Sequence, residues 1–181
     1  KLENYIDELF RKHKKNKIIK IYKNKKNIGL TKSLNKGINL CKGKFIVRLD
    51  DDDISEKNRL NELDSIINRN DLAMLISSSY LKINKSGKVI GKKLITKKKL
   101  FSKYKYKNII GHSSVCFNKK YITEIGLYNE NFSCSQDFEL WNRCIIQNKN
   151  NIFVSNKFLV KIRHHEDTVS YKHSYTQRFN S

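Results

Sequence analysis

Proline is missing from this 181-residue sequence, and acidic residues are few. Average usage would give about nine prolines in a chain of this length. Lys, Asn and Ile, whose codons are rich in A and T, supply 31, 21 and 22 residues. A bias in the composition of the coding sequence therefore explains both the missing proline and the excess of lysine.

The charge is strongly one-sided, because 38 Lys and Arg outnumber 17 Asp and Glu and leave a formal net charge of +21. Such a balance is typical of proteins with a polyanionic partner, above all nucleic acid. The lysines are nevertheless spread along the chain, so we favour composition alone as the explanation and keep a polyanionic partner as the alternative. The apolar content of 38%, with nine Phe and nine Tyr, excludes a disordered polybasic tail.

Long apolar runs are also missing. The longest is about five residues, whereas a membrane-spanning helix needs roughly 20, so the sequence predicts no such helix. No charged-then-apolar leader opens the chain, and we expect a cytoplasmic protein, free or at the cytoplasmic face of a membrane. The four cysteines form no C-x-x-C pair, which argues against structural zinc and favours free thiols in a reducing compartment.

The first half of the chain alternates between helical and strand patterns. In chain order we expect a helix over 2–10, a strand over 17–22, a helix over 30–41, a strand over 45–49, a helix that Ser55 caps, and a strand over 72–77. This alternation predicts an α/β fold with a mostly parallel sheet and crossover helices.

The second half begins with a hairpin signal, because strand patterns over 78–83 and 88–92 flank the turn residues Asn84–Gly87. A basic, aromatic stretch, a short strand at 114–117, a helix over 136–147 and strands over 152–154 and 158–162 follow. No linker or repeat interrupts these patterns, so we expect one domain over residues 1–181.

Four of the nine Asp residues are consecutive, from Asp50 to Asp53, between an apolar strand and a helix. Adjacent carboxylates repel one another, and a helix N-terminus offsets part of that repulsion. A divalent cation with oxygen ligands, Mg²⁺ or Mn²⁺, offsets more of it. Open α/β sheets bind ligands at the carboxyl ends of their strands. The run therefore indicates a metal-assisted phosphate site, and a solvated acidic turn is the alternative.

Two further groups of residues suggest chemistry. Asp137 opens the helix over 136–147, where an Asp either stabilises the helix dipole or acts as a general base aimed into a cleft. His164 and His165 follow Arg163 after an apolar strand. A surface histidine pair is usually without function, but an imidazole beside oxygen ligands suits an ion such as Mn²⁺.

Taken together, these segments resemble the family-2 glycosyltransferases, inverting enzymes with the Rossmann-like GT-A fold. Asn27–Ile38 is similar to the family's N-x-G-L-x-x-x-L-N-x-G-I helix. Gly43–Asp53 is similar to its G-x-[YF]-I-x-x-L-D-x-D-D strand. Three later stretches keep the family's order and spacing: His112–Phe117, Ile125–Trp141 and Ile162–Ser170.

On the donor side, the resemblance implies a role for each motif residue. Asp50 and Asp52 match the D-x-D pair that holds Mn²⁺ or Mg²⁺ and the diphosphate of a nucleotide sugar. Asp53 and Asn27 are expected to contact the same donor. His165, rather than its neighbour, matches the position near the metal.

On the acceptor side, the resemblance implies that Asp137 is the catalytic base and that His112 and Trp141 lie near the acceptor. The expected reaction transfers a sugar, with inversion, to a hydroxyl of a glycan, lipid-linked or protein acceptor in polysaccharide or glycolipid synthesis. We expect no specific nucleic acid partner. Peripheral membrane contact stays open, and the sequence does not indicate an oligomeric state.

One part of the family pattern has no counterpart in this sequence. The family begins with a strand and a P-x-Y-N turn, then a helix and a strand ending in Asp-Asp, which together bind the base and ribose. We therefore expect a GT-A sheet without its first βαβ unit, about 45 residues, and a piece inactive on its own. The alternatives are a nucleotidyltransferase that forms nucleotide sugars and a non-enzymatic basic module that binds a polyanion.

Overall fold

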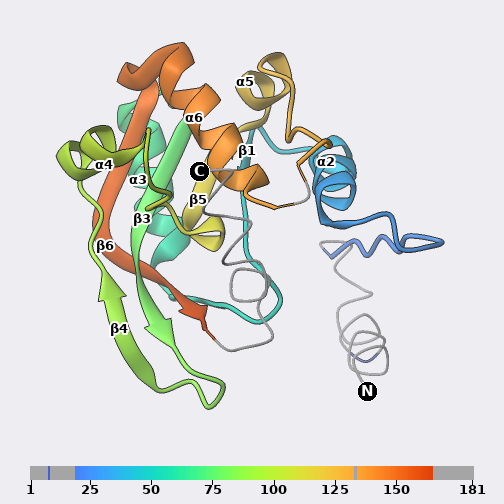
Figure 1. Cartoon of the computed structure of the whole chain (residues 1–181), viewed down its shortest axis with the longest axis horizontal. Coiled ribbons are helices and arrows are strands. Elements are labelled where there is room, and N and C mark those ends of the chain that lie inside the picture. The colour runs from blue at the N-terminus through green and yellow to red at the C-terminus, as the bar shows by residue number, and fades with distance from the viewer. Residues whose placement is uncertain (1–7, 9–18, 133, 165–181) are drawn as a thin grey trace.

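The computed structural model describes residues 8, 19–132 and 134–164, which form a twisted sheet with helices packed on its faces (Figure 1). In chain order the elements are α2 (Leu30–Leu40), β1 (Phe45–Val47), β2 (Ile54–Ser55), α3 (Arg59–Arg69), β3 (Leu75–Ile83), β4 (Val89–Lys93), α4 (Lys97–Lys103), η2 (His112–Ser114), β5 (Val115–Asn118), α5 (Lys119–Glu124), α6 (Gln136–Asn148), η3 (Lys149–Asn151) and β6 (Ile152–Arg163). The expected α/β class is confirmed.

The strand directions differ from the expectation of a mostly parallel sheet. The strand order is β1-β5-β3-β6-β2, with β4 also paired to β3, and only the β3–β6 pair is parallel among the described strands. β1 and β3 still run in the same direction, as a crossover connection through α3 requires. The later strand β5 lies between them, antiparallel to both, and this insertion is what the local pattern could not predict.

The central strands are longer than the apolar pattern predicts. The sequence suggests that one strand ends at Ser77 and another begins at Ser78, yet Ser77, Ser78 and Ser79 lie inside the nine-residue strand β3 and are fully buried. The Ser79 hydroxyl accepts a hydrogen bond from the Ile95 N–H at 2.9 Å, which makes a buried serine tolerable. β6 likewise joins the two strands expected over 152–162 and shifts register opposite these serines.

Ser55 does not cap a helix, contrary to the expectation. Ile54 and Ser55 form the short strand β2, which pairs with Lys161 and Val160 of β6. Because this pairing holds the backbone extended, α3 begins only at Arg59. The helix expected over 136–147 is confirmed as α6, and its predicted apolar face is buried (Phe138, Trp141 and Ile145).

Residues 19–22 form no strand, contrary to the pattern, and their side chains are exposed, Tyr22 by 56%. A strand needs a neighbouring backbone with free hydrogen-bonding groups, and no described strand pairs with this segment. Residues 17–18 and most of the helix expected over 2–10 lie outside the described residues.

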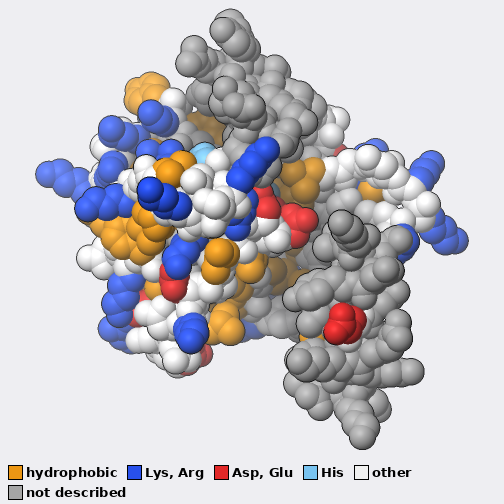
Figure 2. Space-filling model, turned by 90° about the horizontal axis from the view of Figure 1, so that it is seen from below, with side chains coloured by type: hydrophobic (Ala, Val, Ile, Leu, Met, Phe, Trp, Pro, Cys, Tyr) orange, Lys and Arg blue, Asp and Glu red, His pale blue; other side chains and the backbone are white. Residues whose placement is uncertain are grey.

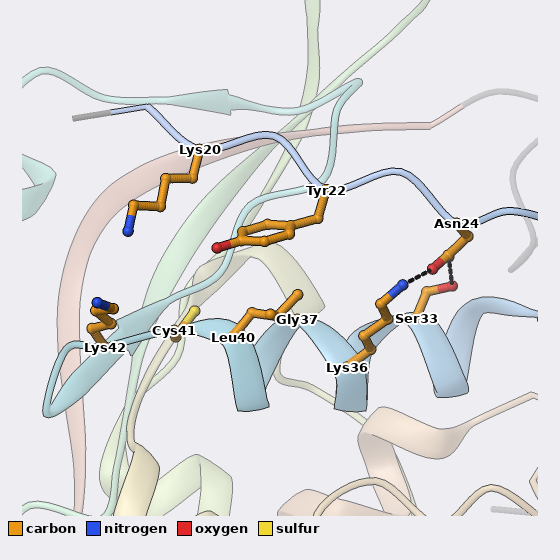
Figure 3. A pocket seen from close by; sticks show the side chains of 9 residues that line it. All are labelled: Lys20, Tyr22, Asn24, Ser33, Lys36, Gly37, Leu40, Cys41 and Lys42. Atoms are coloured by element: carbon orange, nitrogen blue, oxygen red, sulfur yellow. Dashed lines mark hydrogen bonds between the residues drawn. The ribbon is translucent and has the colours of Figure 1, made fainter. Parts of the chain in front are cut away.

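The segment instead lies along α2 and lines with it an open pocket of about 600 Å³ (Figure 3). Asn24 links this segment to α2 by two hydrogen bonds. Its side-chain amide donates to the Ser33 hydroxyl at 3.0 Å and accepts from Lys36 Nζ at 2.8 Å. Lys20, Tyr22 and Leu40 line the remaining wall.

All four cysteines lie in the described part of the chain and none of them forms a disulfide bond, and Cys116, Cys134 and Cys144 are buried. None of the helices in the described part of the chain is both long enough and apolar enough to cross a membrane.

Candidate active site

The acidic run forms a turn directly after β1, and a single arginine neutralises its first member. The Arg48 guanidinium binds both carboxylate oxygens of Asp50: Nη1 lies 2.5 Å from Oδ2, and Nη2 donates to Oδ1. The Ser113 hydroxyl donates to Asp50 Oδ2 at 3.1 Å and accepts from the Asp50 N–H at 2.9 Å. Arg48 therefore supplies a positive charge that offsets the repulsion among these carboxylates. The N-terminus of α3, which the sequence suggested for this role, lies farther along the chain, at Arg59.

This arrangement shifts the pKa values of Asp50 and Asp53 in opposite directions. Burial by itself would raise the pKa of Asp50, but the hydrogen bonds and charge of Arg48 outweigh burial and hold that pKa below its usual value. Burial also raises the pKa of Asp53, and the nearby charges of Asp50 and Asp52 add to this effect. Asp52 is half-buried and Asp51 is exposed.

The end of β6 fixes the other side of the acidic turn. The Arg163 N–H donates to Asp53 Oδ1 at 2.7 Å, and Arg163 Nε donates to the Asp52 carbonyl at 2.9 Å. Its Nη1 binds the carbonyls of Asn84 and Lys85 in the β3–β4 turn, each at 2.7 Å. Arg163 thus positions the acidic turn against the hairpin, while His165 lies outside the described residues.

A second arginine, Arg59, binds the backbone of the segments that carry Arg48 and Ser113. Arg59 is only 1% exposed, and its Nη2 donates to the carbonyls of Arg48 at 2.8 Å, Ser113 at 2.7 Å and Val115 at 3.3 Å. It therefore joins the first turn of α3 to the end of β1 and the start of β5.

We expect Arg59→Met to lower the free energy of unfolding by about 3 kcal/mol, because it leaves buried carbonyls without their charged donor. Urea unfolding followed by circular dichroism measures the change. Arg69→Met, at the exposed end of the same helix, is the matched control and should cost less than about 0.5 kcal/mol. Equal losses in the two variants would contradict this role of Arg59.

Asp137 is the second residue of α6, and its carboxylate is held by a side chain from a distant loop. Asn108 Nδ2 donates to Asp137 Oδ2 at 2.9 Å. Asn108 Oδ1 accepts from the Ile110 N–H at 3.2 Å, so the amide is oriented with its donor toward the carboxylate. Burial raises the pKa of Asp137 above its usual value, although the Phe138 N–H, Asn108 and the charge of Arg48 oppose this rise.

His112 stands beside Asp50 and Arg48 and is neutral at physiological pH. Burial, with the charge of Arg48, lowers its pKa to about 3. Its Nε2 shares a hydrogen bond of 2.8 Å with the Tyr128 hydroxyl. Trp141 meets the His112 ring edge-on with centroids 6.1 Å apart, but it is only 1% exposed. The structure thus places Trp141 in the core behind His112.

Three of the candidate residues meet at the short helix η2, because His112 belongs to it, Asp50 binds Ser113, and Trp141 packs against the His112 ring. Ser113 contacts Asp50 and Arg48, and the preceding residue His112 faces Tyr128. Asn27 is exposed, and its described hydrogen bond is local, from the Gly29 N–H to Oδ1 at 2.9 Å.

The sequence reasoning missed Arg48, Ser113 and Asn108. For Arg48 the sequence did hold a signal, because it is a charged residue within the apolar strand expected over 45–49. No comparable signal marked Ser113 or Asn108.

The acidic turn offers few ligands to a divalent cation. Within residues 19–132 and 134–164, no three His, Cys, Asp or Glu side chains gather closely enough to hold a metal ion. Asp50 already binds Arg48 through both oxygens. Mg²⁺ commonly takes one or two protein carboxylates and completes its shell with water and substrate phosphates. The half-buried carboxylate of Asp52 fits that smaller requirement.

Comparison with known proteins gives a consistent result. The family model described as glycosyl transferase family 2 matches residues 2–125. An uncharacterised glycosyltransferase of Methanocaldococcus jannaschii, MJ1057, is 32% identical over 90% of this chain and 56% of its own length. The UDP-Gal:alpha-D-GlcNAc-diphosphoundecaprenol beta-1,3-galactosyltransferase of Escherichia coli is 29% identical over 77% of this chain and 53% of its own.

Among solved structures, TarS of S. aureus in complex with UDP-GlcNAc superposes with a TM-score of 0.66. The match covers 89% of this chain and 46% of the TarS chain at 14% identity, so it shows a shared GT-A fold. The chain spans about half the length of the curated relatives that it matches.

Proposed function

Because the chain belongs to glycosyl transferase family 2, we propose that it transfers a sugar from a nucleotide-sugar donor to an acceptor hydroxyl with inversion. The observation that carries this proposal is that the fold fixes a carboxylate at each of two motif positions. In the acidic turn after β1, Asp50 is bound by Arg48, and at the start of α6, Asp137 is bound by Asn108.

The names of the relatives support a class of donor and acceptor. TarS was crystallised with UDP-GlcNAc, and the E. coli relative is named for UDP-Gal. A UDP-sugar is therefore the donor that we propose. The same E. coli name specifies a sugar on diphosphoundecaprenol, which supports a lipid-linked acceptor in polysaccharide or glycolipid synthesis.

On the donor side, we assign the proposed cation, Mg²⁺ or Mn²⁺, to Asp52 together with phosphate oxygens of the donor. A bound cation of this kind stabilises the charge that develops on the departing diphosphate. Asp50, held by Arg48, supports the turn that presents Asp52. Asp53 is fixed by the Arg163 N–H and is available to a donor hydroxyl when it is ionised.

On the acceptor side, Asp137 accepts the proton of the attacking hydroxyl. A carboxylate with a raised pKa is a stronger base than an ordinary one, and burial supplies this property. A single displacement then inverts the anomeric carbon, so that one carboxylate base is sufficient, whereas a glycosidase needs two carboxyl groups. Neutral His112 does not compete as an acid at physiological pH.

The proposal is tested by measuring UDP release from UDP-sugars with and without Mn²⁺ and a lipid-linked acceptor. Release that requires both cation and acceptor supports it. A nucleotidyltransferase would instead consume a nucleoside triphosphate, and a basic binding module would release no UDP. The family match favours the transferase over these two alternatives.

We expect Asn108→Ala to shift the acidic limb of the pH–rate profile to higher pH and to lower the rate about tenfold near that limb, because a hydrogen bond to the charged carboxylate is lost. The charged and titratable groups that also act with Asp137 are Arg48, Tyr80 and Tyr128, and all three are retained. Asn150→Ala, at an exposed site, is the control. An NMR titration of the Asp137 carboxyl carbon that shows no upward shift in Asn108→Ala would refute this role.

A further inference from the structure

One continuous part of the chain is basic without interruption. Between Asp71 and Glu124 there are 13 Lys and no Asp or Glu. At the chain-wide frequency of 17 in 181, about five acids would be expected there. A bias that enriches lysine throughout the chain does not by itself remove the acids from one segment.

The fold gathers five of these lysines into one place, which we call the lysine face: Lys82 on β3, Lys93 on β4, Lys99 and Lys103 on α4, and Lys107 in the loop that follows. Burial lowers the pKa of Lys93, and the positive charges of the other four lower it further. None of the ion pairs between described residues includes a member of this face.

Exposed apolar side chains belong to the same hairpin and helix region. Ile90 on β4 is 56% exposed and Tyr106 after α4 is 79% exposed, and Val89 and Leu94 are exposed as well. Figure 2 shows blue and orange side chains interleaved at its left, the side on which β4 and α4 lie in Figure 1. Lysines combined with exposed apolar groups are typical of surfaces that bind anionic membranes.

We propose that the lysine face, with Val89, Ile90, Leu94 and Tyr106, docks onto an anionic lipid surface. The lysines meet the lipid headgroups, and the aliphatic side chains enter the headgroup boundary. A nucleic acid would use the lysines but would leave Val89, Ile90 and Leu94 in water, which favours the membrane.

The lysine face is connected to the candidate active site through two sets of hydrogen bonds. Arg163 joins the β3–β4 turn to Asp52 and Asp53, and Asn108, next to Lys107, holds Asp137. Docking through the hairpin and the loop after α4 would therefore bring the acidic turn and the base close to the lipid surface. Binding of this face to a membrane does not require the proposed reaction.

The test is co-sedimentation of the full chain with vesicles of phosphatidylcholine alone or of equal parts phosphatidylcholine and phosphatidylglycerol. We expect binding to the anionic vesicles only, decreasing with salt. The triple variant Lys93→Gln/Lys103→Gln/Lys107→Gln should bind them roughly 10- to 100-fold more weakly. The control Lys32→Gln/Lys42→Gln/Lys120→Gln removes equal charge from α2, the loop after it and α5, and should retain nearly full binding.

A second variant separates apolar contact from charge. Ile90→Ser/Tyr106→Ser should weaken vesicle binding roughly tenfold while it leaves the binding of a fluorescent single-stranded RNA unchanged. Circular dichroism confirms that each variant is folded. Equal losses in the two lysine triples, or binding to RNA without binding to vesicles, would overturn the proposal. Vesicle binding without sugar transfer would overturn only the proposed function, and the reverse result only the docking.

Discussion

Asp137→Asn is expected to reduce the rate of sugar transfer about 10²- to 10⁴-fold, the usual contribution of a general base, while donor affinity changes little. The substitution keeps the shape of the side chain, and the Asn108 amide can still donate to the new amide oxygen. What is lost is the ability to take up the acceptor proton. Transfer rates at saturating donor, together with calorimetric titration of UDP, measure the two quantities separately.

The pH dependence of the wild-type protein gives an independent check. The base works only when it is ionised, so activity is present above the pKa of Asp137 and is lost as the pH falls through it. Because burial raises that pKa, we expect the acidic limb of the pH–rate profile to lie at higher pH than an ordinary Asp would give. We expect this limb to be absent from the profile of Asp137→Asn.

The exposed residue Asp64 on α3 provides the control Asp64→Asn, which should leave both rate and profile intact. A large loss of donor affinity in Asp137→Asn would show that Asp137 contacts the donor, and the assignment as base would then be wrong.

Asp52→Asn is expected to abolish the dependence of donor binding on Mn²⁺ and to weaken binding of the donor by at least about 100-fold, since a cation–carboxylate contact carries several kcal/mol. Calorimetric titration of UDP with and without Mn²⁺ measures this directly. Asp51→Asn is the matched control, because Asp51 is adjacent, exposed and in the variable position of the D-x-D motif. Retained Mn²⁺-dependent binding in Asp52→Asn would rule out the assignment.

Asp50→Asn should behave differently from both. The Arg48 guanidinium, 9% exposed, would lose its charged partner, and an unpaired buried charge is strongly destabilising, by about 3 kcal/mol or more. We therefore expect a lowered midpoint of urea unfolding in Asp50→Asn, whereas Asp52→Asn should unfold at nearly the wild-type urea concentration.

The local elements and the family followed from the sequence. The helical spacing of Leu34 and Ile38 predicts α2, the turn residues Asn84–Gly87 predict the hairpin, and the stripe that includes Trp141 predicts α6. These features depend on neighbours within a few residues, so their period is visible in the chain itself. The same holds for the motifs that identify glycosyl transferase family 2, because each is contiguous.

The tertiary structure decided the features that join distant residues. Ser55 reads as a helix cap but pairs with Val160 of β6, and β5 enters the sheet between two strands that precede it in the chain. Strand pairing depends on which backbones meet, and a local period carries no record of that.

The site shows the same division between sequence and fold. The sequence by itself determined that four carboxylates follow β1 and that Asp137 lies in the first turn of α6. The fold decided that Ser113, 63 positions from Asp50, binds it, and that Asn108, 29 positions from Asp137, orients it. The hydrogen-bonding capacity of Ser or Asn is general, and its partner is selected only when packing brings the two groups within about 3 Å.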